Sequence, residues 1–484
     1  MSKFNPVTTG AMRTVNNEGY PAYRMDGKTK LVHQVLTSFI NESKFYGDNT
    51  DELIDTLKYV TKKEPAFVSK LALFARREFN MRSVSHVLVG YLANIPEGKP
   101  FVKETVKGVV LRGDDATEIL SFYLNTFGKP IPNSLRKALR DVFTGFDAYT
   151  LAKYKGESKS IKMRDILCLC HPTPKDDKQS ETWKALLEDR IQPAYTWETE
   201  LSAKGNNKET WEGLISSGKV GYMALLRNLR NIINAEPSNI PDVFKKIADP
   251  NEVRKSRQLP FRFLSAYRNI PQNSWYSRDA LDAINAAAEA AVENLPKIPG
   301  RTVIAIDVSG SMSSCISSKS DIRCCDISMM LGFIADKICE KSRVFTFDSY
   351  LREIYPPKQG GLITNVAQYS TCSGGTYMQL PFDYILRNDV DCDRVIVISD
   401  NECNGWNGIS NCQSLISRYR IKVKHPVWVH AIDLMGYGTQ QFIGKETNLI
   451  AGWSEKVFEF IKYAEEGEDS LIKRIEGYAP FKPQ

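Results

Sequence analysis

Apolar residues recur every three to four positions along most of the first 300 or so residues, which is the spacing of one face of an α-helix. Prolines interrupt this spacing repeatedly, and proline begins or ends helices. We therefore expect an all-α region of helices of roughly 10–15 residues, stacked as antiparallel pairs. The periodic sets are Leu31/Val35/Leu36/Phe39, Leu53/Leu57/Val60, Phe67/Leu71/Phe74, Val84/Val87/Leu88/Tyr91, Ile119/Phe122/Leu124 and Met223/Leu226/Leu229/Ile233.

A different pattern begins near residue 300, where short apolar runs alternate with longer helical stretches. This order is typical of a parallel sheet covered by helices on both faces. The expected strands are 303–306, 344–347, 395–398 and 427–432, and the expected helices are 326–341, 379–387, 413–420 and 454–463. The segment NLPKIPG at 294–300 separates the two patterns. We place a domain boundary there, between an all-α domain at 1–299 and an α/β domain at 300–484.

The composition is that of an ordinary globular protein: 484 residues with 64 Lys+Arg, 57 Asp+Glu, a net charge of +7 and 42% hydrophobic residues. It excludes wholesale disorder, a collagen-like repeat and a disulfide-dense miniprotein. No apolar run approaches the roughly 18 residues that span a bilayer, and the first residues lack the apolar core of a signal peptide. We expect a cytoplasmic protein with no membrane partner, whose ten cysteines are thiols.

The positive charge is concentrated in the first region. Residues 1–299 carry nine more basic than acidic residues, whereas residues 300–484 carry two more acidic than basic residues. A basic excess on one domain favours a polyanionic partner for that domain.

Oxygen-bearing side chains follow two of the expected strands. Asp307, Ser309 and Ser311 alternate directly after strand 303–306, so in an extended stretch they point the same way. Thr376, in a Gly-Gly-Thr loop, and Asp400, after strand 395–398, lie where carboxyl ends of parallel strands meet. Few carboxylates and several hydroxyls suit Mg²⁺. The set resembles the metal-ion-dependent adhesion site of von Willebrand factor A domains, which implies a bound Mg²⁺ or another divalent cation.

Other interpretations of these residues fit less well. A haloacid-dehalogenase-type phosphotransferase needs an aspartate two positions after Asp307, where Ser309 stands. A serine hydrolase needs a G-x-S-x-G turn with a matched histidine, and neither His425 nor His430 can be tied to these serines from the sequence. A simple turn, with Asp400 as an ordinary cap, stays a structural alternative. We predict metal binding without catalysis.

Two cysteine-rich strings invite a zinc interpretation. Neither Cys324-Cys325 nor Cys168-x-Cys170-His171 has the paired C-x₂-C spacing of a structural zinc site. Buried core thiols are the favoured interpretation.

A basic segment, KYKGESKSIKMR at 153–164, is followed by DILCLCHP at 165–172. Lysine and arginine bind phosphates, and tyrosine or histidine stacks on bases, where proteins hold single-stranded RNA. The alternatives are a solvated helix face and, for the histidine, a core position. The candidate RNA-binding residues are Lys153, Lys155, Lys159, Lys162, Arg164 and His171.

Several strings resemble the TROVE domain of Ro ribonucleoproteins, and the order of a helical domain before an A domain fits that family. The sequence resembles bacterial or phage members of the 60 kDa Ro autoantigen family. The strings are KYK at 153–155, RDILCLCHP at 164–172, TWETELS at 196–202, NKETWE at 207–212, YMALLRNLRNI at 222–232, LPFRFL at 259–264 and ISDNE at 398–402.

The resemblance implies a monomeric ring of HEAT-like helical pairs with a basic hole, clasped by the A domain. It implies a non-enzymatic protein that binds Y RNA on its outer surface and single-stranded ends of misfolded noncoding RNA in the hole. Bacterial members are tethered through Y RNA to polynucleotide phosphorylase. Lys153 and His171 match family positions that contact Y RNA. A third such position falls near Lys159, but the loop is one residue longer, so Lys155 or Lys162 can take its place.

Two further pairs of residues, one of arginines and one of phenylalanines, each allow a functional and a structural interpretation. Arg227 and Arg230 share a helix face, where they either line the hole or pair with acids such as Glu212. Phe261 and Phe263 are expected in the core rather than as stacking platforms.

Our leading hypothesis is an RNA-binding protein of RNA quality control or degradation. The alternative is a divalent-cation-dependent protein-binding scaffold with incidental RNA binding, and a third class is a metal-dependent phosphohydrolase.

Overall fold

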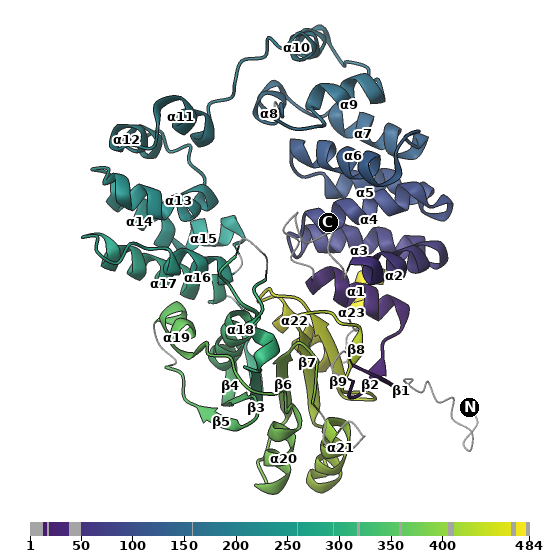
Figure 1. Ribbon diagram of the computed structural model, residues 1–484, viewed down its shortest axis with the longest axis vertical. Coiled ribbons are helices and arrows are strands. Elements are labelled where there is room, and N and C mark those ends of the chain that lie inside the picture. The colour runs from purple at the N-terminus through teal and green to yellow at the C-terminus, as the bar shows by residue number, and fades with distance from the viewer. Residues whose placement is uncertain are drawn as a thin grey trace. The chain divides into compact units, whose positions relative to one another are not determined.

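The computed structural model of the chain describes residues 13–16, 19–37, 50–156, 158–258, 260–293, 295–316, 320–357, 361–404, 411–465 and 471–480 (Figure 1). These residues form two compact units. We call the first, from Met1–Phe39, Leu259–Leu264 and Val292–Ile472, the sheet unit. The second, from Ile40–Gln258, Ser265–Ala291 and Lys473–Gln484, is the helical unit. Each unit takes segments from both sides of residue 299, so the boundary expected there stays a prediction.

The helical unit consists of short helices in series, as the periodic apolar sets indicate. Proline stands at the start of several of them, for example Pro65 at the first position of α3. The helices are α2 (Thr50–Lys63), α3 (Pro65–Arg77), α4 (Ser83–Asn94), η1 (Pro96–Phe101), α5 (Val102–Val109), α6 (Gly113–Phe127), α7 (Asn133–Phe143), α8 (Ala148–Lys153), α9 (Met163–Cys170), α10 (Asp177–Leu187), α11 (Trp197–Lys204), α12 (Lys208–Ser216), α13 (Tyr222–Ala235), α14 (Ile240–Ala248) and α15 (Pro250–Ser256). Three more contain residues of both units: α16 (Pro260–Arg268), α17 (Ser277–Val292) and α23 (Leu471–Gly477).

A buried charge network joins α3, α4 and α6. The Asp115 carboxylate accepts hydrogen bonds from Arg76 Nη2 at 3.0 Å and from Arg82 Nε at 2.5 Å. His86 Nε2 lies 3.1 Å from the same carboxylate, and the amides of Leu111 and Arg112 donate to it as well. Asp115 is fully buried, so this network fixes the first turn of α6 against α3 and α4.

The sheet unit contains a six-stranded sheet in the order β5-β4-β3-β6-β7-β9, in which all neighbours are parallel except β5 against β4. Its strands are β3 (Ile298–Asp307), β4 (Cys339–Phe347), β5 (Leu351–Ile354), β6 (Arg394–Ser399), β7 (Trp428–Asp433) and β9 (Thr447–Ala451). Its helices are α1 (Gly27–Thr37), η2 (Gly310–Ser313), α18 (Cys324–Ile338), α19 (Leu362–Tyr369), α20 (Gln379–Arg387), α21 (Asn411–Val423) and α22 (Val457–Glu465).

Helices cover both faces of this sheet. Val303 and Ala305 of β3 pack in one core cluster with Phe382 of α20 and Ile416 of α21. On the opposite face, α18 approaches β3 so closely that a Cβ at Gly332 would stand 2.2 Å from Ile306 Cδ1. The alternate residues of β3 therefore face two helical layers, as expected for a buried parallel strand.

A second, antiparallel sheet of three strands, β1 (Arg13–Val15), β2 (Pro21–Arg24) and β8 (Thr439–Gln440), ties the N-terminal segment to the sheet unit. Next to it, His33 Nδ1 of α1 lies 2.9 Å from Asp433 Oδ2 at the end of β7, and both side chains are buried. The helix expected from Leu31, Val35 and Leu36 is therefore present, but it packs in the sheet unit. Phe39 of the same set lies outside the described residues.

All four predicted strands are confirmed as β3, β4, β6 and β7. The helix predicted at 379–387 is confirmed with the same bounds. The helix predicted to reach residue 341 ends at Ile338, because Cys339 begins β4 and pairs with Ile298. The helix predicted from residue 454 begins at Val457. Among the described residues, no helix combines the length and the apolar character needed to cross a membrane.

Candidate functional site

The loop that leaves β3 places three predicted residues in contact. Asp307 is the last residue of β3, and its Oδ1 accepts a hydrogen bond of 2.8 Å from the Ser309 amide. The hydroxyl oxygens of Ser309 and Ser311 lie 3.1 Å apart. Asp307 and Ser309 are fully buried, whereas Ser311 is exposed in η2. The alternation predicted from the sequence therefore leads from the interior to the surface.

Asp400 lies beside Asp307 because β6 pairs with β3. The Ser399 hydroxyl donates to Asp307 Oδ2 at 2.6 Å and lies 3.4 Å from Asp400 Oδ1. The Ser311 side chain acts to lower the pKa of Asp400, against the effect of burial. Sequence reasoning missed Ser399, although its position at the end of a strand directly before Asp400 was a usable signal.

Thr376 belongs to a third loop, which hydrogen bonds to the loop after β3 and to the loop after β6. The Gly310 amide donates to Gly374 O at 3.0 Å, and the Asn404 amide donates to Thr376 O at 2.7 Å. Gly374 has a φ of +74°, and a Cβ there would stand 2.7 Å from Ser349 Oγ, so the loop needs glycine at this position. The structure thus brings all five predicted metal-site residues to one edge of the sheet.

The two carboxylates are held without a compensating charge. Among the described residues no Lys, Arg or His pairs with Asp307 or Asp400. Burial, followed by the charge of Asp400, raises the pKa of Asp307 to about 7, and burial raises the pKa of Asp400 to about 6. The part of the chain that the structure describes holds no group of three or more His, Cys, Asp or Glu side chains arranged so that they could bind a metal ion by themselves. The donor set is therefore two carboxylates with neighbouring hydroxyls, which fits a hard cation such as Mg²⁺.

These raised pKa values predict how stability depends on pH. In a chelating buffer, the folded protein keeps protons on Asp307 and Asp400 at pH values where the unfolded chain has lost them. The stability of the sheet unit should therefore fall as the pH rises from about 4 to about 7. Thermal unfolding of wild type and Asp400→Asn across this range measures the effect, which should be smaller in the variant. Identical slopes would contradict the assigned pKa shifts.

Fold and hydrogen bonding do not support a serine hydrolase at this edge. His430, on β7, is buried and its Nε2 lies 2.9 Å from Glu465 Oε1. His425 Nδ1 lies 2.9 Å from Pro426 O. Neither histidine is bonded to Ser309 or Ser311 in the described part of the chain.

The basic segment of the helical unit divides into paired and unpaired cations. Lys155 Nζ lies 2.6 Å from Asp189 Oδ1, and Lys159 Nζ lies 3.5 Å from Glu118 Oε1. Lys153 is exposed at the end of α8, and its Nζ lies 5.7 Å and 5.5 Å from the ring centroids of Tyr149 and Tyr154. Of these three lysines, Lys153 is the one that an RNA phosphate reaches without first breaking a described ion pair.

The remaining three candidates frame α9. Lys162 precedes the helix, and its amide donates to Asp165 Oδ2 at 2.7 Å. Arg164 is exposed in the first turn. His171 follows the last turn in a left-handed conformation with a φ of +49°, and it is exposed. The core alternative for His171 is therefore wrong, because the helix ends before the side chain can turn inward.

The structure confirms the interpretation of one further pair, the phenylalanines, and it shows no pairing of the two arginines with Glu212. Arg227 and Arg230 are both exposed on α13, and Glu212 accepts a hydrogen bond from the Ser238 amide instead of pairing with them. Phe261 and Phe263 are buried, as predicted.

The expectation that every cysteine is a thiol is wrong for one pair. Cys325 and Cys372 form a disulfide, because the fold places the first turn of α18 beside the loop that leads to Thr376. The other eight cysteines form no disulfide in the described part of the chain, and Cys168 and Cys315 are the exposed ones among them.

Comparison with known families gives matches to two consecutive parts of the chain. The model of the TROVE domain matches residues 36–195 and 187–294, which together span more than half of the chain. The chain belongs to the TROVE family. A second model, the Ro60 vWA domain, matches residues 301–442 of this TROVE protein. The helical TROVE region is thus followed by a vWA domain with a mostly parallel sheet, as the resemblance implied.

Individual relatives of this TROVE protein cover parts of it. Telomerase protein component 1 of Rattus norvegicus is 26% identical over 325 residues, 50% of this chain but 12% of that protein. RNA-binding protein RO60 of Caenorhabditis elegans is 28% identical over 228 residues, 44% of this chain and 35% of that protein. The crystal structure of the Deinococcus radiodurans RO (RSR) protein superposes with a TM-score of 0.64 at 16% identity, covering 92% of this chain and all of that one. This structural match shows a shared fold.

Proposed function

We propose that this TROVE protein is a cytoplasmic, non-catalytic RNA-binding protein. It binds small structured noncoding RNA of the Y RNA type through the surface around Lys153 and His171, and it binds single-stranded ends of misfolded RNA. The observation that carries the proposal is an exposed basic segment on a TROVE domain, with Lys153 and His171 exposed and Lys153 in no described ion pair. The RNA-binding relative from Caenorhabditis elegans supports it.

RNA quality control or degradation is the process in which such a protein acts. A nuclease partner, such as an exoribonuclease of the polynucleotide phosphorylase type, would act on RNA that the helical unit presents. No catalytic group of this chain is needed for that role.

A filter-binding assay at about 0.1 M salt tests the proposal. A small structured RNA should bind with an affinity that falls steeply with salt, since each phosphate contact adds about 0.7–0.9 to the log–log slope. Lys153→Ala and His171→Ala should each weaken the binding of this RNA, and His171→Ala should leave the binding of a single-stranded tail unchanged. Lys103→Ala, which removes a lysine paired with Asp141 elsewhere on the helical unit, is the matched control. Failure of the wild-type protein to bind either RNA would overturn the proposal.

The sheet unit supports a second, compatible function. Asp307, Ser309, Ser311, Thr376 and Asp400 would hold Mg²⁺, and the bound cation would supply a positive charge for an acidic side chain of a protein partner. The observation that favours this function is the pair of buried, uncompensated carboxylates surrounded by hydroxyls. A protein partner that binds wild type in Mg²⁺, and is lost with a chelator, would support it.

A further inference from the structure

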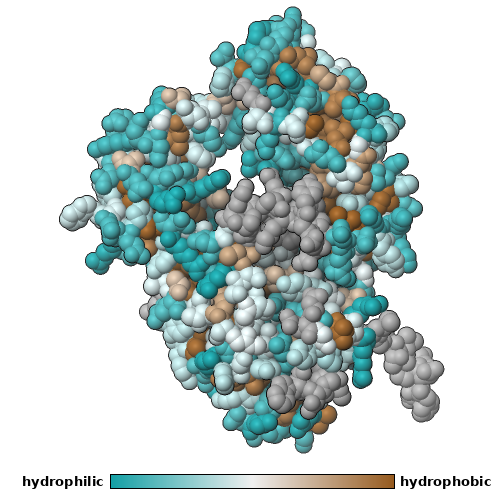
Figure 2. All heavy atoms as spheres, in the orientation of Figure 1, coloured by the Kyte–Doolittle hydropathy of each residue, from teal (hydrophilic) through white to brown (hydrophobic). Residues whose placement is uncertain are grey.

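A hollow of about 990 Å³ lies entirely within the helical unit. Its walls come from α8 and the start of α6 on one side and from α11, α12 and α13 on the other. This volume lies at the upper end of the roughly 300–1,000 Å³ typical of small-ligand sites. The hollow is therefore large enough for a nucleotide-sized ligand. On the face that Figure 2 shows, hydrophilic residues prevail over α11–α14.

Aromatic rings line this hollow from both sides. Tyr149 lies on α8 and Tyr154 directly follows it, whereas Trp197 begins α11 and Tyr195 lies two residues before it. Tyr149 and Tyr195 are 53% and 43% exposed, and neither has an aromatic partner among the described residues. An exposed ring face in a hollow is the surface on which a flat, unsaturated ligand stacks.

Cations accompany these rings. Arg112, Lys153, Lys219 and Arg227 line the hollow, and Glu198 is the one acidic residue among the described lining residues. Lys219 Nζ lies 5.1 Å from the Tyr195 ring centroid, and the Arg112 guanidinium lies 5.4 Å from that of Tyr154. Arg112 also pairs with Asp114. Lys153, Lys219 and Arg227 have no carboxylate partner among the described residues, so phosphates meet cations whose charge is not already neutralised.

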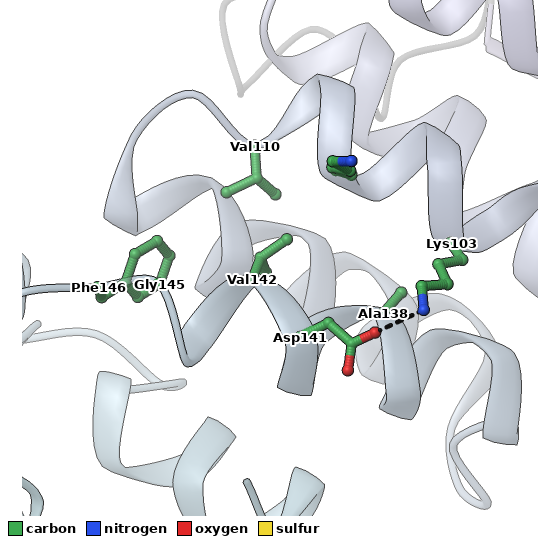
Figure 3. A pocket seen from close by; sticks show the side chains of 8 residues that line it. Lys103, Val110, Ala138, Asp141, Val142, Gly145 and Phe146 are labelled. Carbon is green, nitrogen blue, oxygen red and sulfur yellow. Dashed lines mark ion pairs between the residues drawn. The ribbon is translucent and has the colours of Figure 1, made fainter. Parts of the chain in front are cut away.

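A second hollow of the helical unit differs from the first in its lining residues. It lies between α5 and α7, is about 440 Å³ in volume, and is lined by Val110, Ala138, Val142 and Phe146 (Figure 3). Its Lys103 is already paired with Asp141 at 3.0 Å. It offers one aromatic ring, Phe146, and two lysines, Lys103 and Lys107, of which Lys103 is neutralised, so it lacks the combination found in the larger hollow.

We propose that the larger hollow, which we call the stacking pocket, binds unpaired nucleotides of an RNA strand by stacking bases on Tyr195 and Trp197 and pairing phosphates with Lys219 and Arg227. The proposal rests on the proposed RNA binding and adds a second contact area to it. Lys153 belongs both to the basic segment and to this pocket, so one RNA can extend from the first area into the second. Stacking is tolerant of sequence, because every base has an aromatic face.

The test compares a short oligoadenylate with an abasic strand of the same length and charge. Wild type should bind oligoadenylate more tightly, and Tyr195→Ala or Trp197→Ala should weaken it about 5- to 100-fold, the loss expected for one stacked base. The abasic strand should respond little to these two variants. Lys219→Ala and Arg227→Ala should each reduce the salt slope by about 0.7 for both strands.

Tyr59→Ala is the matched control, because Tyr59 is 54% exposed on α2 with Lys63 Nζ 4.7 Å from its ring centroid, outside the pocket. Circular dichroism confirms that each variant is folded. If wild type binds structured RNA and oligoadenylate but the pocket variants bind both as wild type does, the pocket assignment is overturned and the proposed function stands. Equal losses for the abasic strand would overturn stacking. Binding of an oligoglutamate peptide in place of oligoadenylate would assign the pocket to an acidic protein and overturn the proposal.

Discussion

Replacing Asp115 by alanine should lower the free energy of unfolding by about 3–5 kcal/mol. The carboxylate is fully buried and bonded to Arg76 of α3, to Arg82 at the start of α4 and to His86 of α4. Its removal would leave the buried Arg76 guanidinium without its carboxylate, and an uncompensated buried charge is strongly destabilising. Urea unfolding followed by far-ultraviolet circular dichroism measures the loss as a lower midpoint.

The neighbouring Asp114→Ala is the matched control. Asp114 is 23% exposed and pairs with Arg82 and Arg112, and such pairs contribute about 0–1 kcal/mol each. Burial alone would raise the pKa of Asp115, but His86, Arg76 and Arg82 outweigh it and hold the pKa well below its usual range. The stabilisation is therefore complete above about pH 4 and is lost as the pH falls below it, so the wild-type advantage over Asp115→Ala should shrink in acid. Equal effects of the two substitutions would show that the network does not depend on Asp115.

Asp307→Asn should weaken Mg²⁺ binding by more than about 100-fold, since loss of a residue that only supports a ligand already reduces affinity by about 10- to 100-fold. Asparagine keeps the shape and can still accept from the Ser309 amide, but it removes a charge that burial and Asp400 both disfavour. The metal-free variant should therefore unfold at a higher temperature than metal-free wild type near pH 8. Calorimetric titration and thermal unfolding measure the two effects.

Asp336→Asn provides the comparison for this variant. Asp336 is also a buried acid of the sheet unit, and its Oδ1 accepts a hydrogen bond of 2.5 Å from Ser342 at the other end of the sheet. This substitution should leave Mg²⁺ binding unchanged. Unaltered Mg²⁺ affinity in Asp307→Asn would rule out Asp307 as a ligand.

The secondary structure was predictable wherever local pattern and tertiary contacts agree. The helix α20 has the predicted bounds because its apolar residues face the sheet throughout. The end of α18 was not predictable, since nothing local stops the helix at Ile338 and only the pairing of Cys339 with Ile298 does so. The edge strand Leu351–Ile354 has four residues and two of them are charged, so it lacks the apolar signature of its neighbours.

The candidate sites show the same division between local and long-range information. The spacing of Asp307, Ser309 and Ser311 is local, and their convergence with Asp400 follows from strand order. The pairing of Lys155 with Asp189 and of Lys159 with Glu118 depends on how separate helices pack, so the sequence could not separate these lysines from Lys153. The meeting of Tyr154 with Tyr195 in one pocket depends on the same packing.

The contact between His33 and Asp433 also has a consequence for biosynthesis. The two residues are 400 positions apart, and at roughly 5–20 residues per second a ribosome needs roughly 20–80 s to make the intervening chain. The first hairpin and α1 are made early, but their partners β7 and β8 are made about 400 residues later. Most of the helical unit is synthesised in that interval. Translation therefore gives the helical unit time to fold first, while β2 keeps an unpaired edge until β8 has been made.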